Sequence, residues 1–155
     1  MREEIAEATK SAMKAGEKRR LSTLRLISAA IKDRDIAARV DDKGRSTGRE
    51  RIDEAEILQL LQKMIKQRRE AEETYRDAGR AELVEQEAFE ISVIEEFMPE
   101  QMSDEDIRAA VTETIAAEAA ASLKDMGRTM GALKSKYAGR MDFAKASAIA
   151  KALLS

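Results

Sequence analysis

The stretch from Ser122 to Asp142 reads SLKDMGRTMGALKSKYAGRMD and is the most informative segment of the chain. Apolar side chains recur in it every three or four residues, which at about 100° per residue places them on one face of an α-helix. The spacing therefore predicts a helix from about Leu123 to Tyr137. Its apolar face would consist of Leu123, Met126, Met130, Leu133 and Tyr137.

Two glycines, Gly127 and Gly131, stand one turn apart beside this apolar face and separate it from Lys124 and Arg128. A glycine inside a helix costs about 1 kcal/mol relative to alanine. Two glycines in register therefore indicate that something large approaches the helix backbone. The sequence leaves two possibilities open, a neighbouring helix that crosses over the glycines or the backbone of a nucleic acid.

The composition of the 155 residues is typical of an all-α protein, with one proline, seven glycines and 3% aromatic residues. The absence of cysteine and histidine excludes disulfides, thiolate metal sites, cysteine nucleophiles and imidazole ligands. We therefore predict no metal site and no cofactor. The chain has no run of roughly 18 apolar residues and no apolar signal segment at its N-terminus, so we expect a soluble cytoplasmic protein without a membrane partner.

The formal net charge of -2 conceals an uneven distribution of charged residues. Basic residues greatly outnumber acids from Lys10 to Arg34, and again from Ser122 to the C-terminus. Between these segments, Glu70 to Asp106 is strongly acidic. Such blocks matter more for the choice of partner than the total charge does.

Glycines and the single proline divide the chain into helices. Gly16, Gly79 and Pro99 end helical patterns, and the polar stretch 41–49 is predicted as a mobile loop. We predict an N-terminal four-helix domain over residues 1–99 and a small three-helix domain over residues 100–155. The expected helices cover residues 2–15, 18–38, 53–78, 80–97, 104–119, 123–137 and 143–154.

Two charged residues occupy positions where the helical pattern calls for apolar ones. Arg68 falls in the apolar stripe of the third predicted helix, and Glu90 falls in that of the fourth. Since each would be costly to bury alone, we predict a structural ion pair that fixes the register of the two helices. A catalytic role is the alternative, with Glu87 and Tyr75 as the nearby acid–base candidates.

Two basic rows bear on partners. Lys18, Arg25 and Lys32 are seven residues apart on the second predicted helix, a pattern typical of a solvated face that pairs with acids, with nucleic-acid binding as the alternative. The C-terminal row indicates nucleic-acid binding more strongly, because glycines accompany it. A turn at Gly139–Arg140 and the helix that starts near Phe143 could hold a phosphate. With few aromatic residues for base stacking, this surface would suit folded RNA better than a single strand.

The chain resembles the GatB/YqeY family, specifically its free-standing YqeY-like members, over nearly all of its length. Three groups of residues carry the resemblance, in the order that the family has them. They are Leu24 to Lys32, then Lys66 to Glu70 with Tyr75, Ala78 to Arg80, Glu87, Glu90 and Phe97 to Pro99, and then Lys124 to Gly127 with Met130 to Leu133 and Gly139–Arg140.

The resemblance implies a larger N-terminal helical domain followed by a three-helix domain that is similar to the tail of the B subunit of the glutamyl/aspartyl-tRNA amidotransferase. That tail helps to hold the tRNA body, while the catalytic cradle lies in other domains. This chain has no cradle domain, no cysteine and no phosphate-binding glycine-rich loop of the P-loop type. Carried over by resemblance, the RNA-contact candidates are Lys124, Gly127, Arg128, Gly131, Lys134 and Arg140.

We therefore predict a non-catalytic protein that binds tRNA or associates with the tRNA amidotransferase or another translation-related protein, and that does not bind DNA. Two alternatives remain. The chain could be a component of a glutamine-dependent carbon–nitrogen ligase, or a protein-interaction adaptor that uses the acidic surface from Glu70 to Asp106.

Overall fold

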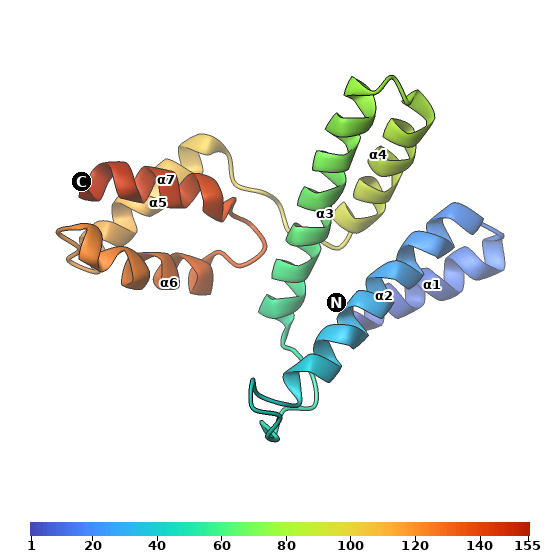
Figure 1. Cartoon of the computed structure of the whole chain (residues 1–155), viewed down its shortest axis with the longest axis horizontal. Helices are drawn as coiled ribbons and strands as arrows, with labels where there is room; N and C mark the ends of the chain where they lie inside the picture. Colours follow the sequence, from blue (N-terminus) through green and yellow to red (C-terminus); the bar gives the residue numbers. More distant parts are fainter. The chain divides into compact units, whose positions relative to one another are not determined.

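The computed structural model describes all residues from Met1 to Ser155 and confirms the all-α prediction. It contains seven α-helices, one short 3₁₀ helix and no strand beyond an isolated bridge between Val40 and Ser46 (Figure 1). The helices fall into two compact units, Met1–Met98 and Pro99–Ser155, and each unit has its own hydrophobic core.

The first unit contains α1 (Arg2–Ala15), α2 (Lys18–Ala38), α3 (Glu54–Asp77) and α4 (Ala81–Glu95). In Figure 1, α1 and α2 form one hairpin and α3 and α4 form another, and α2 contacts both helices of the second hairpin. Gly16 ends α1 in the left-handed conformation that glycine adopts without strain, which allows the tight turn into α2. The largest fully buried side chains of this core are Leu24, Ile27, Ile57, Leu61 and Ile94.

The segment between α2 and α3 forms a hydrogen-bonded turn, where the sequence predicts a loop without regular structure. The Asp41 carboxylate accepts hydrogen bonds from the backbone N–H groups of Lys43 and Arg45, each at 2.9 Å, and from the Arg45 guanidinium. The backbone N–H of Thr47 donates to the Arg39 carbonyl. The bonds from Arg45 and Lys43 to the Asp41 carboxylate hold its pKa below its ordinary value. Together with the Thr47–Arg39 bond, they close the turn locally.

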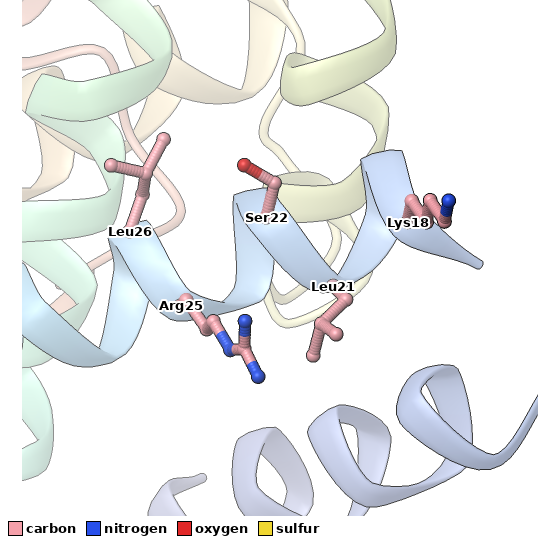
Figure 2. Close-up of a pocket in the computed structure, with 5 residues that line it drawn as sticks. All are labelled: Lys18, Leu21, Ser22, Arg25 and Leu26. Carbon is pink, nitrogen blue, oxygen red and sulfur yellow. The ribbon is translucent and has the colours of Figure 1, made fainter. Parts of the chain in front are cut away.

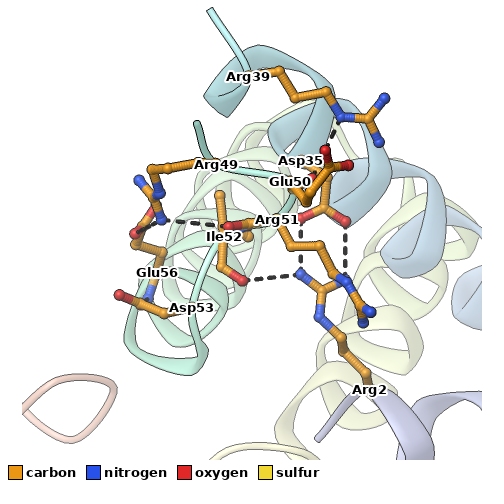
Figure 3. Close-up of polar contacts among 9 residues, drawn as sticks. All are labelled: Arg2, Asp35, Arg39, Arg49, Glu50, Arg51, Ile52, Asp53 and Glu56. Carbon is orange, nitrogen blue, oxygen red and sulfur yellow. Dashed lines mark hydrogen bonds and ion pairs between the residues drawn. The ribbon is translucent and has the colours of Figure 1, made fainter. Parts of the chain in front are cut away.

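A partly buried polar network joins α1, α2 and Ile52, which lies two residues before the start of α3 (Figure 3). The Arg2 guanidinium donates to both carboxylate oxygens of Asp35, at 2.9 and 2.7 Å, and to the Ile52 carbonyl at 3.0 Å. The Ile52 N–H in turn donates to Asp35 at 2.9 Å. Asp35 is only 8% exposed, and its hydrogen bonds to Arg2, followed by the one from Ile52, lower the pKa of this carboxyl group.

The second unit contains α5 (Asp104–Ala117), a 3₁₀ turn η1 (Leu123–Asp125), α6 (Met126–Lys136) and α7 (Phe143–Leu154). Each of its three α-helices contacts the other two. Ser103 begins α5 with a capping box in which Ser103 and Asp106 each accept from the other's backbone N–H. The core of this unit consists of Ile107, Ala110, Val111, Leu133, Met141, Ala146 and Ala150.

The start of α6 differs from the prediction. The Asp125 carboxylate accepts from the N–H groups of Ala121 and Ser122, at 2.8 and 3.2 Å, and this tightens the chain into a 3₁₀ turn before the helix begins at Met126. As a result Leu123 is 48% exposed and does not join the apolar face. The expected contacts of Met126, Met130, Leu133 and Tyr137 with the core are present.

Candidate nucleic-acid interface

The outward face of α6 contains both glycines of the predicted site. Gly127 and Gly131 are exposed, on the side of the helix opposite the buried Thr129 and Leu133. A Cβ atom built on either glycine would meet nothing within 4 Å. No helix of the same unit crosses over the glycines, so the expectation of a helix crossing inside the three-helix domain is wrong. The backbone of α6 is open to solvent at this point.

Two lysines flank this open backbone without a carboxylate partner. Lys124 lies in η1 at the N-terminal end of the face, and Lys134 lies in the last turn of α6. Both are exposed, and neither forms an ion pair. With Gly127 and Gly131 they form what we call the α6 face.

Arg128 lies beside this face but is bound within the chain. Its guanidinium lies 3.5 Å from the Glu118 carboxylate and 3.4 Å from that of Asp125, and it donates to the Glu118 carbonyl at 2.8 Å. These contacts join the end of α5 to the start of α6. A phosphate would have to compete with two carboxylates for Arg128, which makes it a weaker candidate than Lys124 or Lys134.

Arg140 holds a turn together. Its side chain donates to the Glu100 carbonyl at 3.3 Å, and its own carbonyl accepts from the Met102 N–H at 2.9 Å. The Gln101 side chain donates to the Gly139 carbonyl at 2.7 Å, and Gly139 is in the left-handed conformation. These contacts fasten the segment that precedes α5 to the turn that precedes α7.

The predicted phosphate position at the start of α7 is occupied by a side chain of the protein. The Asp142 carboxylate accepts from the N–H groups of Ala144 and Lys145, at 3.0 and 3.2 Å. Because this carboxylate already binds the first amides of the helix, a phosphate would be repelled there. Lys145 is also engaged, in a 2.9 Å ion pair with Asp104.

In the first unit, Arg68 and Glu90 meet across the α3–α4 hairpin. The Arg68 Nε atom lies 2.9 Å from Glu90 Oε2, and the Arg68 guanidinium also donates to the Met64 carbonyl. The two side chains are 17% and 16% exposed. Nearby, burial and then the charge of Glu90 raise the pKa of Glu87. Glu87, an acid–base candidate in the sequence, therefore lies near Arg68, but the Arg68 guanidinium is already paired with Glu90.

In the acidic stretch of the sequence, seven of the fourteen acids form ion pairs in the structure. Its acids reach arginines on α2, α3 and the start of α4, and Arg19 also lies 4.8 Å from the centre of the Phe89 ring. The other seven acids form no ion pair, so half of the negative charge that an adaptor would use stays unpaired. The pairs that the acidic stretch forms within this unit are Arg19–Glu85, Arg20–Glu96, Arg68–Glu90, Arg69–Glu95, Arg76–Glu72 and Arg80–Glu82.

The structure brings together no group of three or more carboxylates that could hold a metal ion. None of its helices combines the length and the apolar character that a membrane span requires.

Comparison with known proteins identifies a family and a curated relative. The family described as "Yqey-like protein" matches residues 2–154. The curated protein "Altered inheritance of mitochondria protein 41, mitochondrial" from Eremothecium gossypii is 31% identical over 124 residues, which cover 80% of this chain. The chain spans 60% of the length of that relative.

Proposed function

Since the chain belongs to the YqeY-like family, we propose that it is a non-catalytic tRNA-binding protein whose α6 face rests on the RNA backbone. In this proposal it acts in the cytoplasm, beside the tRNA amidotransferase or another translation-related protein. The relative from Eremothecium gossypii is described by its name as a mitochondrial protein.

One observation carries the proposal, namely the open helix backbone between two lysines that lack acidic partners. Gly127 and Gly131 lower the stability of α6 without serving any contact inside the chain. They allow an outside surface to approach the helix more closely than any side chain would permit. Lys124 and Lys134 supply positive charge at the two ends of that contact, and on binding they would release cations condensed on the phosphate chain.

The chemistry of the face favours folded RNA. Its groups are backbone, two ammonium ions and no exposed aromatic ring, so it offers nothing on which unpaired bases could stack. Phosphates and sugar hydroxyls of an RNA helix are recognised by charge and shape, which a flat helix flanked by lysines provides.

The test is a titration of fluorescent tRNA with the full chain at salt concentrations from 50 to 300 mM. We expect the logarithm of the affinity to fall linearly with that of the salt concentration. The double variant Lys124→Gln/Lys134→Gln should reduce the slope by about 1.5, at roughly 0.7 to 0.9 for each phosphate that is no longer neutralised. Gly127→Leu should weaken binding at all salt concentrations without changing the slope, because it obstructs the approach and removes no charge.

Lys63→Gln/Lys66→Gln is the matched control, since it removes the same charge from exposed positions on α3 that form no ion pair. If the control and the Lys124/Lys134 variant reduce the slope equally, binding depends on total charge and the α6 face is not the site. If wild-type protein does not bind tRNA at 50 mM salt, the proposed function is wrong. Glutamine turnover on mischarged tRNA by the chain alone would instead support the ligase alternative.

A further inference from the structure

The outward face of α2 carries a second row of cations without acidic partners. Lys18, Arg25 and Lys32 follow one another at intervals of seven residues, which places them on one side of the helix and spreads them over roughly 21 Å. All three are exposed. The sequence predicts that such a row pairs with acids, but none of the three forms an ion pair. We call these residues the α2 row.

Two other arginines on the same helix, Arg19 and Arg20, are engaged with acids. Arg20 pairs with Glu96 and lies 3.6 Å from Glu17, and Arg19 lies within 3.9 Å of Glu85. These residues lie toward α4, whose acids they neutralise. The helix therefore separates its cations into a set that binds α4 and a set that faces solvent, and only the second set is available to an outside anion.

Small side chains separate the cations of the α2 row, as glycines separate those of the α6 face. Ser22 lies between Lys18 and Arg25, and Ala29 lies between Arg25 and Lys32. Figure 2 shows a shallow hollow around Ser22, and all the residues that line it come from α2. The lining residues are Lys18, Leu21, Ser22, Arg25 and Leu26.

Charge and shape together favour a phosphate chain over a protein helix. A partner helix would need a continuous apolar ridge, but Leu21 and Leu26 are five residues apart and lie on opposite sides of Ser22. The outward stripe between Lys18 and Lys32 contains no carboxylate. We propose that the α2 row is a second contact for the phosphate backbone of RNA. This inference rests on the proposed function. In it, the first unit contacts the same RNA molecule as the α6 face.

The first test compares two triple variants of the full chain in the tRNA titration. Lys18→Gln/Arg25→Gln/Lys32→Gln removes the α2 row, and Lys10→Gln/Lys63→Gln/Lys66→Gln removes equal charge from scattered exposed positions that form no ion pair. Because three phosphates would no longer be neutralised, the salt slope should fall by about 2 to 3 and the affinity at 0.1 M salt by about a hundredfold. The control should retain most of both.

A second measurement does not depend on the folding of a variant. Acylation of lysines in the wild-type chain, read by mass spectrometry, should show protection of Lys18 and Lys32 by tRNA and no protection of Lys10. A tRNA complex that protects Lys124 and Lys134 but leaves Lys18 and Lys32 reactive would overturn the α2 row while the proposed function stands.

Two further outcomes also decide against the proposal. If the wild-type chain does not bind tRNA at 50 mM salt, the α2 row loses its ligand together with the proposed function. If polyglutamate protects Lys18 and Lys32 while tRNA does not, the row recognises an acidic protein and the assignment to RNA is wrong.

Discussion

The α3–α4 hairpin and the α6 face use charged residues in opposite ways. Along the hairpin, arginines meet glutamates within the same unit, and the Arg68–Glu90 pair is mostly buried. On the α6 face, Lys124 and Lys134 have no such partner. Arginine suits fixed contacts because its planar guanidinium binds a carboxylate in a defined geometry, whereas lysine presents a hydrated point charge on a flexible stem. The difference indicates which charges hold the fold and which remain available to a ligand.

The strongest test of the internal role is Arg2→Met. It removes the two hydrogen bonds that Arg2 donates to the buried Asp35 and leaves the one from the Ile52 N–H. Breaking a buried pair costs about 3 to 5 kcal/mol, and because the Arg2 side chain is 30% exposed we expect about 3 kcal/mol, measured by urea unfolding. Arg76→Met, which breaks an exposed pair with Glu72, is the control and should cost a small fraction of that. Equal losses would mean that the network does not matter.

The Arg68–Glu90 pair should have a smaller effect, because one hydrogen bond joins its two side chains, whereas two join Arg2 to Asp35. We expect Arg68→Met and Glu90→Leu each to lower the free energy of unfolding by about 2 kcal/mol, since each leaves one charge half-buried and unpaired. The double variant should recover much of that loss, which a double-mutant cycle in urea would measure. Strictly additive effects would show that the two side chains do not stabilise each other.

The pH dependence of stability should report on Asp35. Its pKa is lower in the folded chain than in the unfolded one, so its contribution is complete above pH of about 4 and is lost as the pH falls through the folded value. The urea midpoint should therefore decrease below pH of about 4, and Asp35→Asn should flatten that decrease. A variant as acid-sensitive as the wild type would assign the effect to other carboxylates.

On the α6 face, alanine should stabilise the protein. Gly127→Ala and Gly131→Ala each add a Cβ atom that meets nothing within 4 Å, in helical backbone, so each should gain about 0.5 to 1 kcal/mol. The thermal midpoint would rise by a few degrees, while tRNA affinity should not improve. Destabilisation by either change would mean that the glycines serve a contact within the chain.

The smallest effect should come from separating the two units, which we propose to be independent domains. The fragment of residues 1–98 should unfold cooperatively, with a free energy close to that of its part in the full chain, because its core is its own. Calorimetry of this fragment and of residues 99–155 would check it. A fragment that does not unfold cooperatively would show that the units depend on each other.

Helical periodicity and caps are sufficient to predict the helices. The ends of α1, α2 and α7 agree with the prediction. Gly16 marks the end of α1, and the capping Asp142 marks the start of α7. Charged residues in apolar stripes point to Arg68 and Glu90. The same signal is present at Asp35, a buried carboxylate outside the predicted sites that continues the buried series of Leu24, Ile27 and Ile31. Its partner Arg2 lies 33 residues away on another helix, so the spacing of residues within one helix does not identify it.

The candidate site is less predictable, because its properties depend on contacts between segments. The glycine pattern of α6 is the same whether a helix or an outside ligand covers it, and only the packing of the second unit excludes a helix of that unit. Arg128 and Lys134 are equivalent cations in the sequence, yet Glu118 binds only Arg128. The prediction of a phosphate at the start of α7 is wrong because the Asp142 carboxylate that caps the helix also competes for its amides.

The closed turn between α2 and α3 has a practical consequence for experiments on this chain. Hydrogen bonds accepted by the Asp41 carboxylate and donated by the Thr47 N–H secure the turn at its base. The Arg2–Asp35–Ile52 network secures the chain where it enters α3. The tip at Gly44 is exposed, and a Cβ atom built on this glycine would meet nothing within 4 Å. An affinity tag or fluorophore-bearing peptide inserted there would be anchored on both sides and would leave both basic faces unlabelled.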